Sequence, residues 1–180
     1  MPTILTPCRV PWAISPTASA VTLVHSEDDV EPKCKIVLGG GRLTKGLRTD
    51  SRRIDITFKK CYHARLGPHH DSQTIEAIGY QIAESYTGDT NAYIDWRHRT
   101  WIETGNCPDS GFYVARQSEW IPTLPGFFQR GFQHYVVDGR DGYVELVATQ
   151  FTWQEWMWSN CHRDDAPANG PVVGTGEGVA

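Results

Sequence analysis

The sequence predicts a mainly β domain of the α+β class, with an antiparallel sheet that can curl towards a barrel and one covering helix. Three observations support this prediction. Apolar and polar residues alternate with a period of two in several segments. Clusters of Gly, Asp, Asn and Pro separate those segments, as turns between strands require. One segment of consequence has apolar residues at helical spacing.

The clearest alternation lies in Arg53–Cys61 and predicts a half-buried strand. Its buried face would hold Ile54, Ile56 and Phe58. Its exposed face would hold Asp55, Thr57 and Lys59. Further strands are expected at Val21–Val24, Cys34–Leu38, Tyr93–Thr104 and Gly111–Arg116.

The strongest local prediction is a β-hairpin near the end of the chain. Phe132–Val137 and Tyr143–Thr149 are rich in β-forming residues, and Asp138–Gly142 between them supplies two glycines and two aspartates. In this hairpin residues 137 and 143 would lie roughly opposite each other. His134 and Glu145 would then be neighbours only through a bulge, so we expect His134 on the wet face of the sheet.

The helix is expected after residue 71. Asp71 or Ser72 could cap a segment with Ile75, Ile78, Ile82 and Tyr86 at helical spacing. Gly79 inside the segment weakens it by about 1 kcal/mol relative to alanine.

At 180 residues the chain fits one domain. We expect an irregular N-terminal arm over 1–20, a single β-rich globular domain over 21–162, and a flexible Gly-rich and Ala-rich tail over 163–180. No apolar run is long enough to span a membrane, and prolines and an arginine interrupt the first dozen residues where a secretory signal would lie. A cytoplasmic location follows as an expectation.

The five cysteines are an odd number and are widely spaced, with no Cys-x-x-Cys pair. A disulfide framework or a zinc site normally shows denser, paired cysteines. We therefore expect reduced, mostly buried cysteines that behave as small hydrophobes.

The net charge of −4 is unevenly distributed. Residues 33–60 hold nine basic and two acidic side chains, which gives +7 and leaves −11 for the rest of the chain. Such asymmetry can mark a nucleic-acid-binding face. A solvated face that complements acidic surface elsewhere is the commoner explanation, and the acidic remainder makes nucleic-acid binding the less favoured function.

The densest group of reactive side chains follows the predicted strand at 53–61. Cys61–Asp71 offers three histidines, an arginine and a carboxylate around an expected turn at Gly67-Pro68. Histidine with a carboxylate suits proton transfer near neutral pH, and a loop leaving a rigid strand often carries function. The alternatives are a plain polar turn or a contact surface for a ligand or partner. The residues that would make that contact are Tyr62, Arg65, His69, His70 and Asp71.

Catalytic candidates are fewer. If the protein is an enzyme, His63 or His134 would carry the proton, in a pocket lined by Tyr62, Trp96, Trp101 and Tyr135. Ser110 and Ser118 lack the Gly-x-Ser-x-Gly context of a nucleophile. A metal could be imagined among His63, His69, His98, His134 and Asp71, but their spacing does not require convergence, so we predict no metal and no cofactor.

Two segments together resemble a known group. The stretch RIDITFKKCYHARLGPHHD, followed downstream by SGFYVARQSEW and FQHYVVDGRDGYVELVATQF, is similar to a group of small bacterial proteins without an assigned activity. The resemblance covers about 60 of the 180 residues, and it implies no catalytic residue. Size and acidic balance also resemble those of toxin-neutralising immunity proteins.

The function that the sequence favours is a non-enzymatic binding domain on an aromatic-rich β scaffold, similar in size and acidic balance to immunity proteins. Seven tryptophans exceed what a chain of this length ordinarily needs, and tryptophan is enriched where partners dock. The partner would be a protein or a small molecule, with no membrane involved. The alternative is a small enzyme or ligand-binding barrel with a histidine-containing pocket.

Overall fold

The structure is a computed structural model of the chain. It describes residues 2–15, 21–26, 31–68, 79–83, 88–139, 142–157 and 172–176. These residues form two six-stranded groups of paired strands, one α-helix and two short 3-10 turns. The mainly β class with one helix is therefore confirmed.

The first sheet has the strand order β6-β10-β9-β8-β1-β7. Its strands are β1 (Thr3–Pro7), β6 (His63–Pro68), β7 (Tyr80–Ile82), β8 (Phe112–Arg116), β9 (Gln133–Asp138) and β10 (Gly142–Ala148). All its pairings are antiparallel except β1 with β7.

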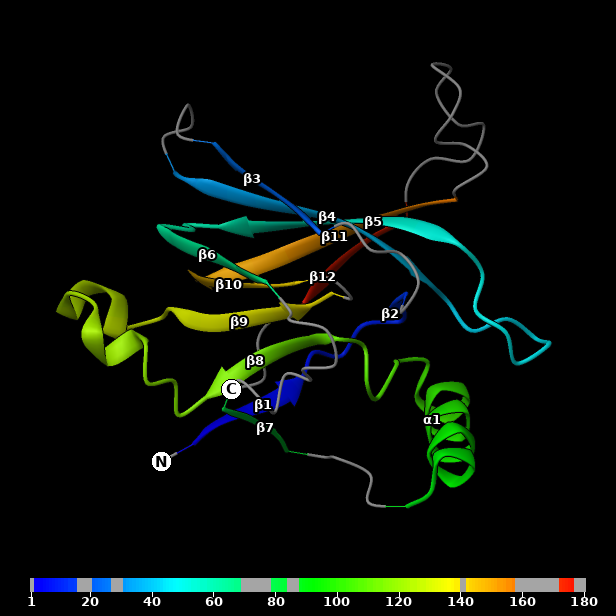
Figure 1. Cartoon of the computed structure of the whole chain (residues 1–180). Helices are drawn as coiled ribbons and strands as arrows, with labels where there is room; N and C mark the ends of the chain where they lie inside the picture. Colours follow the sequence, from blue (N-terminus) through cyan, green and yellow to red (C-terminus); the bar gives the residue numbers. More distant parts are fainter. Residues whose placement is uncertain are drawn as a thin grey trace, which may run out of the picture.

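The second sheet has the order β12-β11-β5-β4-β2, and β3 pairs with β4 beside this path. Its strands are β2 (Ala13–Ile14), β3 (Thr22–Ser26), β4 (Lys33–Gly41), β5 (Arg52–Lys59), β11 (Gln150–Met157) and β12 (Val172–Gly176). The two sheets lie one above the other (Figure 1).

The main core lies between the two sheets. Aromatic side chains from both sides meet there: Phe58 of β5 contacts Phe112 and Tyr135 of the first sheet at ring-centroid distances of 5.9 and 5.2 Å. Trp12 is fully buried and stacks on Phe112. The apolar faces of the strands therefore pack together as alternation predicts.

The first sheet is strongly curled. Tyr80 of β7 hydrogen-bonds to Glu145 of β10, although three strands lie between them. In a flat sheet, strands four places apart would be about 19 Å apart. The face that carries Tyr80 and Glu145 is therefore concave, which confirms the predicted curl.

The predicted hairpin is confirmed, with a register one residue away from the expected one. Tyr143 pairs with Asp138, and Val144 pairs with Val137. The strand at β5 is also confirmed, since Ile54, Ile56 and Phe58 are fully buried. Its other face is not exposed as predicted.

Asp55 on that other face is buried, while Thr57 and Lys59 are half-buried. Two cations cover the carboxylate of Asp55: Lys35 Nζ and Arg53 Nε each lie 2.8 Å from it. Their aliphatic stems remove Asp55 from solvent while their charges compensate its own.

The helix was predicted in the wrong place. Tyr93–Thr104, expected as a strand, lies in α1 (Thr90–Thr104). Asp89 caps its first turn by accepting a hydrogen bond from the Ala92 N–H, and Gly105 ends it at φ 72°. Aromatic and β-branched residues favour strands, but these two end signals outweighed them. Within the segment after residue 71 that was expected to be helical, Tyr80–Ile82 form the strand β7. Residues 71–78 and 84–87 of that segment lie outside the described residues.

Helix α1 does not lie across a sheet. It sits beyond the end of β8 (Figure 1), and Trp101 is its buried residue, packed with Ala13, Cys107 and the half-buried Leu43. The covering role expected for the helix is thus limited to one end of the fold.

Both chain ends contribute strands. The expected irregular arm contains β1 and β2, with Leu5 fully buried within the first sheet. The expected flexible tail contains β12, which pairs with β11. Residues 158–171 and 177–180 lie outside the described ones.

The prediction of reduced cysteines is wrong for one pair. Cys34 of β4 and Cys61, just before β6, form a disulfide with a Cα–Cα distance of 5.6 Å. Cys8 and Cys107 are free and buried, as expected, and Cys161 lies outside the described residues. The two bonded cysteines are 27 residues apart, and only the pairing of β4 with β5 brings them together.

Candidate functional site

A buried carboxylate occupies the concave face of the first sheet. Glu145 of β10 is 1% exposed and lies directly opposite Arg65 of the edge strand β6. Arg65 Nε donates a hydrogen bond to Glu145 Oε2, and the Tyr80 hydroxyl donates to Oε1. Two donors from opposite ends of the curled sheet thus hold one carboxylate.

His134 lies beside this carboxylate on β9. Its side chain is 2% exposed, and its Nε2 is 3.9 Å from Glu145 Oε1. In the ladder His134 faces Val147 and Glu145 faces Val136, so the two polar residues are diagonal neighbours on one face. The expectation that His134 lies on the wet face and needs a bulge to approach Glu145 is wrong.

The contacts of Ser118 fix the tautomer of His134. Ser118 Oγ accepts hydrogen bonds from the N–H groups of Trp120 and Ile121, and it lies 2.8 Å from His134 Nδ1. Because both lone pairs of the hydroxyl are occupied, its hydrogen points to Nδ1. The imidazole proton is therefore on Nε2, which has no hydrogen-bond partner among the described residues.

Burial and, to a smaller extent, the positive charge of Arg65 together lower the pKa of His134 from 6.5 to about 4. At neutral pH the ring is therefore uncharged. It presents an N–H to Glu145 across a gap too long for a hydrogen bond.

The site continues outward through aromatic rings. The Arg65 guanidinium lies over the Trp120 ring at 4.4 Å, and Trp120 contacts His134 edge-on at 5.2 Å. His63 contacts both Trp120 and Phe128. The buried polar group is thus connected to the surface by stacked side chains.

At the surface four rings form what we call the aromatic cluster: Tyr62, Phe127, Phe128 and Phe132. All six pairs are in contact, with centroid distances of 5.2–6.2 Å. Phe127 and Phe128 belong to a short 3-10 turn, Gly126–Gln129, that projects from the end of the sheet (Figure 1). Phe127 is 64% exposed and Tyr62 is 42% exposed.

The chemistry that this arrangement allows is limited by its hydrogen bonds. Ser118, His134 and Glu145 stand in the order of a nucleophile, a base and an orienting carboxylate. Ser118 Oγ, however, has no lone pair free for attack, because it also caps the turn at 120–121. In the part of the chain that the structure describes, no cluster of three His, Cys, Asp or Glu side chains is arranged to hold a metal ion.

Four of the residues singled out in the sequence meet here: Tyr62, His63, Arg65 and His134. The rest do not. Tyr135 points into the core between the sheets, away from His134, and Trp101 of α1 is buried against Ala13 and Cys107. Trp96 contacts Tyr93 on α1. His69, His70 and Asp71 lie outside the described residues.

The expected turn at Gly67-Pro68 is wrong, since both residues lie in β6 and pair with β10. Gly67 is required because Tyr143 crosses it, and a Cβ there would lie 2.2 Å from Tyr143 Cζ. Arg65 therefore points from a strand rather than from a loop.

Sequence reasoning missed Tyr80, Trp120 and the phenylalanines of the aromatic cluster. The available signal for the buried carboxylate was Glu145 itself, an acidic residue inside the apolar run Tyr143–Ala148. Tyr80 carried no signal, because only the curl of the sheet brings it to Glu145.

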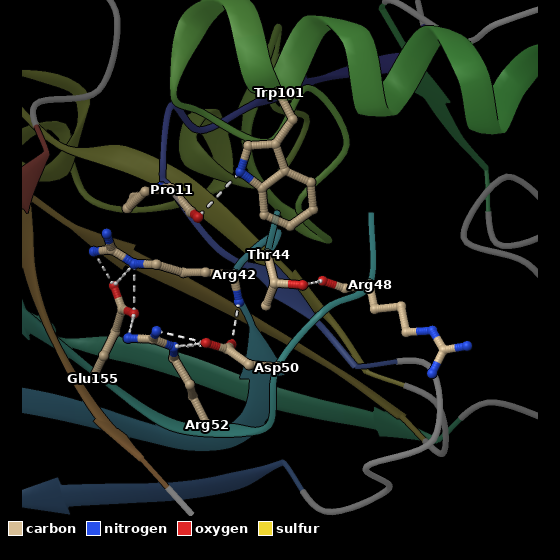
Figure 2. Close-up of polar contacts among 8 residues, drawn as sticks. All are labelled: Pro11, Arg42, Thr44, Arg48, Asp50, Arg52, Trp101 and Glu155. Atoms are coloured by element: carbon tan, nitrogen blue, oxygen red, sulfur yellow. Dashed lines mark hydrogen bonds and ion pairs between the residues drawn. The ribbon is translucent and has the colours of Figure 1, made fainter. Parts of the chain in front are cut away.

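The basic stretch 33–60 is largely neutralised by folding. Glu155 of β11 is fully buried and accepts hydrogen bonds from Arg42 Nη2 at 2.7 Å and Arg52 Nη1 at 3.0 Å. Asp50 accepts from Arg52 Nη2 at 2.6 Å and from the backbone N–H of Arg42 at 2.7 Å (Figure 2). These contacts support the solvated, charge-complemented face over a nucleic-acid-binding one.

A second polar group lines a cavity of about 470 Å³ beside α1. There Asp109 accepts hydrogen bonds from the hydroxyls of Tyr93 and Tyr113, and burial, followed by the contact with Asp109, raises the pKa of both tyrosines. Each carboxylate oxygen of Asp109 already accepts a hydrogen bond from a tyrosine, so we interpret this group as structural.

Comparisons with protein-family models, with curated proteins and with solved structures found no match to this chain. The resemblance to small bacterial proteins therefore stays a prediction. Within the described ranges no helix is both long and apolar enough to cross a membrane.

Proposed function

We propose that this protein is a non-enzymatic binding module that contacts a protein partner through the aromatic cluster. The observation that supports the proposal is the mutual packing of four rings with Phe127 left 64% exposed. A large aromatic side chain in this position exposes apolar surface that is stabilised when a partner covers it.

The cluster is held in place for contact. Tyr62 follows the disulfide-bonded Cys61, and Phe128 packs against His63 at the start of β6. Rings that are already packed lose little side-chain freedom when a partner binds, so more of the contact energy is available for affinity.

Charge near the cluster indicates the chemistry of the partner. Arg65 is 54% exposed beside Trp120. Arg130, which lies in the chain between Phe128 and Phe132 of the aromatic cluster, is also exposed. Because Arg65 is paired with Glu145, Arg130 is the cation that this region presents beside the aromatic rings, in a chain that carries −4 overall. A partner surface that is apolar with an acidic rim would be complementary.

The test compares two exposed apolar positions. Phe127→Ser removes the most exposed ring of the cluster, and Val24→Ser alters β3, where Val24 is 50% exposed. A partner captured by the wild-type protein is purified, and its dissociation constant is measured by calorimetry with each variant. We expect Phe127→Ser to weaken binding at least tenfold and Val24→Ser to leave it unchanged. Equal affinities of wild type and Phe127→Ser would overturn the proposal.

One observation favours the alternative, a small acid–base enzyme or ligand-binding barrel. The neutral His134 faces the buried Glu145 with an unpartnered Nε2–H on the concave face of the sheet. A partner-binding protein should tolerate His134→Gln with its affinity intact, whereas an enzyme should lose turnover in this variant.

The cytoplasmic location expected from the sequence stays a proposal, and the Cys34–Cys61 disulfide weighs against it. Disulfides persist mainly in oxidising compartments. Thiols of the protein taken directly from its source, quantified after denaturation without reductant, distinguish the two cases. Five free thiols would support the cytoplasm, and three would support an oxidising compartment.

A further inference from the structure

A second hollow lies at the opposite end of the sheets from the aromatic cluster (Figure 1), between the basic loop at 42–50 and the end of α1. Its volume is about 410 Å³, within the range of small-ligand pockets. The wall is mainly apolar and includes Pro11, Leu43, Leu47, Trp101 and Ile102. All the residues that line it are described, and Arg42, Thr44 and Lys45 supply its polar atoms.

The loop that forms one wall is rigidly held. The N–H and the hydroxyl of Thr44 both donate hydrogen bonds to the Arg48 carbonyl at 2.8 Å, and the N–H of Leu47 donates to the Thr44 carbonyl. Below this turn, Asp50 and Glu155 bind Arg42 and anchor the loop to the sheet (Figure 2). The pocket is therefore formed before any ligand arrives.

The opposite wall is equally fixed. The indole Nε1–H of Trp101 donates a hydrogen bond to the Pro11 carbonyl at 3.2 Å, which orients the ring above Thr44 (Figure 2). Ile102, one residue later on α1, is 63% exposed.

The backbone of Leu47 has a conformation that is unfavourable for a leucine. Its φ of 56° lies in the left-handed region, where a leucine is strained, while the adjacent Gly46 does not take that conformation. Leu47 is also 52% exposed. The turn that the Leu47 N–H closes on the Thr44 carbonyl, within the hairpin between Leu43 and Thr49, accounts for this conformation and leaves the exposed apolar side chain of Leu47 lining the pocket.

Lys45 supplies a charge that the fold does not use. It lines the pocket and has no ion-pair partner among the residues that the structure describes. Arg42, in contrast, already binds Glu155 through Nε and Nη2. One available cation beside an apolar hollow matches a ligand with one negative charge and an apolar body.

We propose that this pocket binds an amphiphilic carboxylate, an organic acid whose apolar chain packs between Leu47, Trp101 and Ile102 while its carboxylate meets Lys45. A phosphate or nucleic acid would need several free cations in the pocket, but Arg42 is paired with Glu155 and Arg48 does not line the pocket. The site is independent of the function proposed for the aromatic cluster.

The test is a titration of the isotope-labelled protein with decanoate, followed by two-dimensional NMR. The indole N–H of Trp101 and the amide of Gly105 report on the pocket. We expect saturable shifts at both, with a dissociation constant below about 1 mM, which corresponds to about −4 kcal/mol. Decanol, which lacks the charge, should bind at least fivefold more weakly.

Three variants decide the outcome. Lys45→Glu should weaken decanoate binding at least tenfold. Leu47→Gly should weaken it as well, with an unchanged or higher melting temperature, because glycine relieves the strain. Phe127→Ser should bind decanoate normally. Shifts confined to the aromatic cluster, no saturable shift at Trp101, or equal binding by Lys45→Glu would each overturn the proposal.

Discussion

Two buried glutamates in neighbouring sheets are held in different ways. Glu155 of the second sheet is bound by Arg42 and Arg52, and Arg52 is in turn bound by Asp50, so every charge in the group has a close opposite charge (Figure 2). Glu145 of the first sheet is bound by one arginine and one tyrosine, and it faces an imidazole N–H that it does not reach.

In the Glu155 group every charged side chain has an oppositely charged partner, whereas the Glu145 group includes the unpaired Nε2 of His134. The side chains of Arg52 and Arg42 are 18% and 32% exposed, whereas that of Arg65 is 54% exposed. The Glu155 group therefore behaves as a structural clamp. The Glu145 group keeps an unpaired polar atom, a titratable histidine and a route to the surface through Trp120, which are features of functional sites.

The largest expected effect separates the two glutamates directly. Glu155→Ala should lower the free energy of unfolding by about 3–5 kcal/mol, because it leaves two partly buried arginines without their partner. Glu145→Ala should lower it by about 1–3 kcal/mol, because Arg65 can turn into solvent. Urea denaturation of both variants measures the difference, and a larger loss in Glu145→Ala would reverse the comparison.

The second test uses pH. The pKa of His134 is about 4 in the folded protein and 6.5 in a model peptide, so the unfolded chain takes up the proton first as the pH falls. The free energy of unfolding should therefore decrease between pH 6.5 and 4, by up to about 3 kcal/mol. Urea denaturation at a series of pH values should show that His134→Gln abolishes this decrease.

Asp50 provides the control for the pH test. Burial raises the pKa of Asp50, but the hydrogen bond from Arg52, that from the Arg42 N–H and both guanidinium charges together lower it below its ordinary 3.8. Its contribution to stability is present above pH 3.8 and is lost only below that value. Asp50→Asn should thus leave the slope between pH 6.5 and 4 intact, and a loss of that slope would count against His134 as its origin.

The smallest expected effect concerns Ser118. Ser118→Ala removes the hydroxyl that caps the turn and donates to His134, and it should lower the free energy of unfolding by about 1 kcal/mol. The pKa of His134 should rise, because the neutral ring loses a hydrogen bond. An NMR titration of the imidazole protons measures the shift, and Ser118→Thr, which keeps the hydroxyl, should restore the value. An unchanged pKa in Ser118→Ala would mean that this hydrogen bond does not tune the ring.

The strands that could be predicted were those whose pattern is local. Ile54, Ile56 and Phe58 alternate with polar residues, and Asp138–Gly142 contains the residues that a tight turn requires. Where local signals conflicted, the prediction was wrong. The segment at 90–104 has a strand-like composition but helical end signals, and Gly67-Pro68 suggested a turn because the crossing of Tyr143 over Gly67 could not be foreseen.

The sequence by itself determined that Ile54, Ile56 and Phe58 share the buried apolar face of β5, and where the chain reverses at the β9–β10 hairpin. It also placed Arg65, His63 and Tyr62 close together. These follow from periodicity and turn chemistry over a few residues. Only the tertiary structure decided that Tyr80 reaches Glu145, that Ser118 holds His134, and that Glu155 neutralises the basic stretch. Each of those contacts joins segments that are distant in sequence, and each depends on the curl of one sheet or the pairing of strands, which no local pattern specifies.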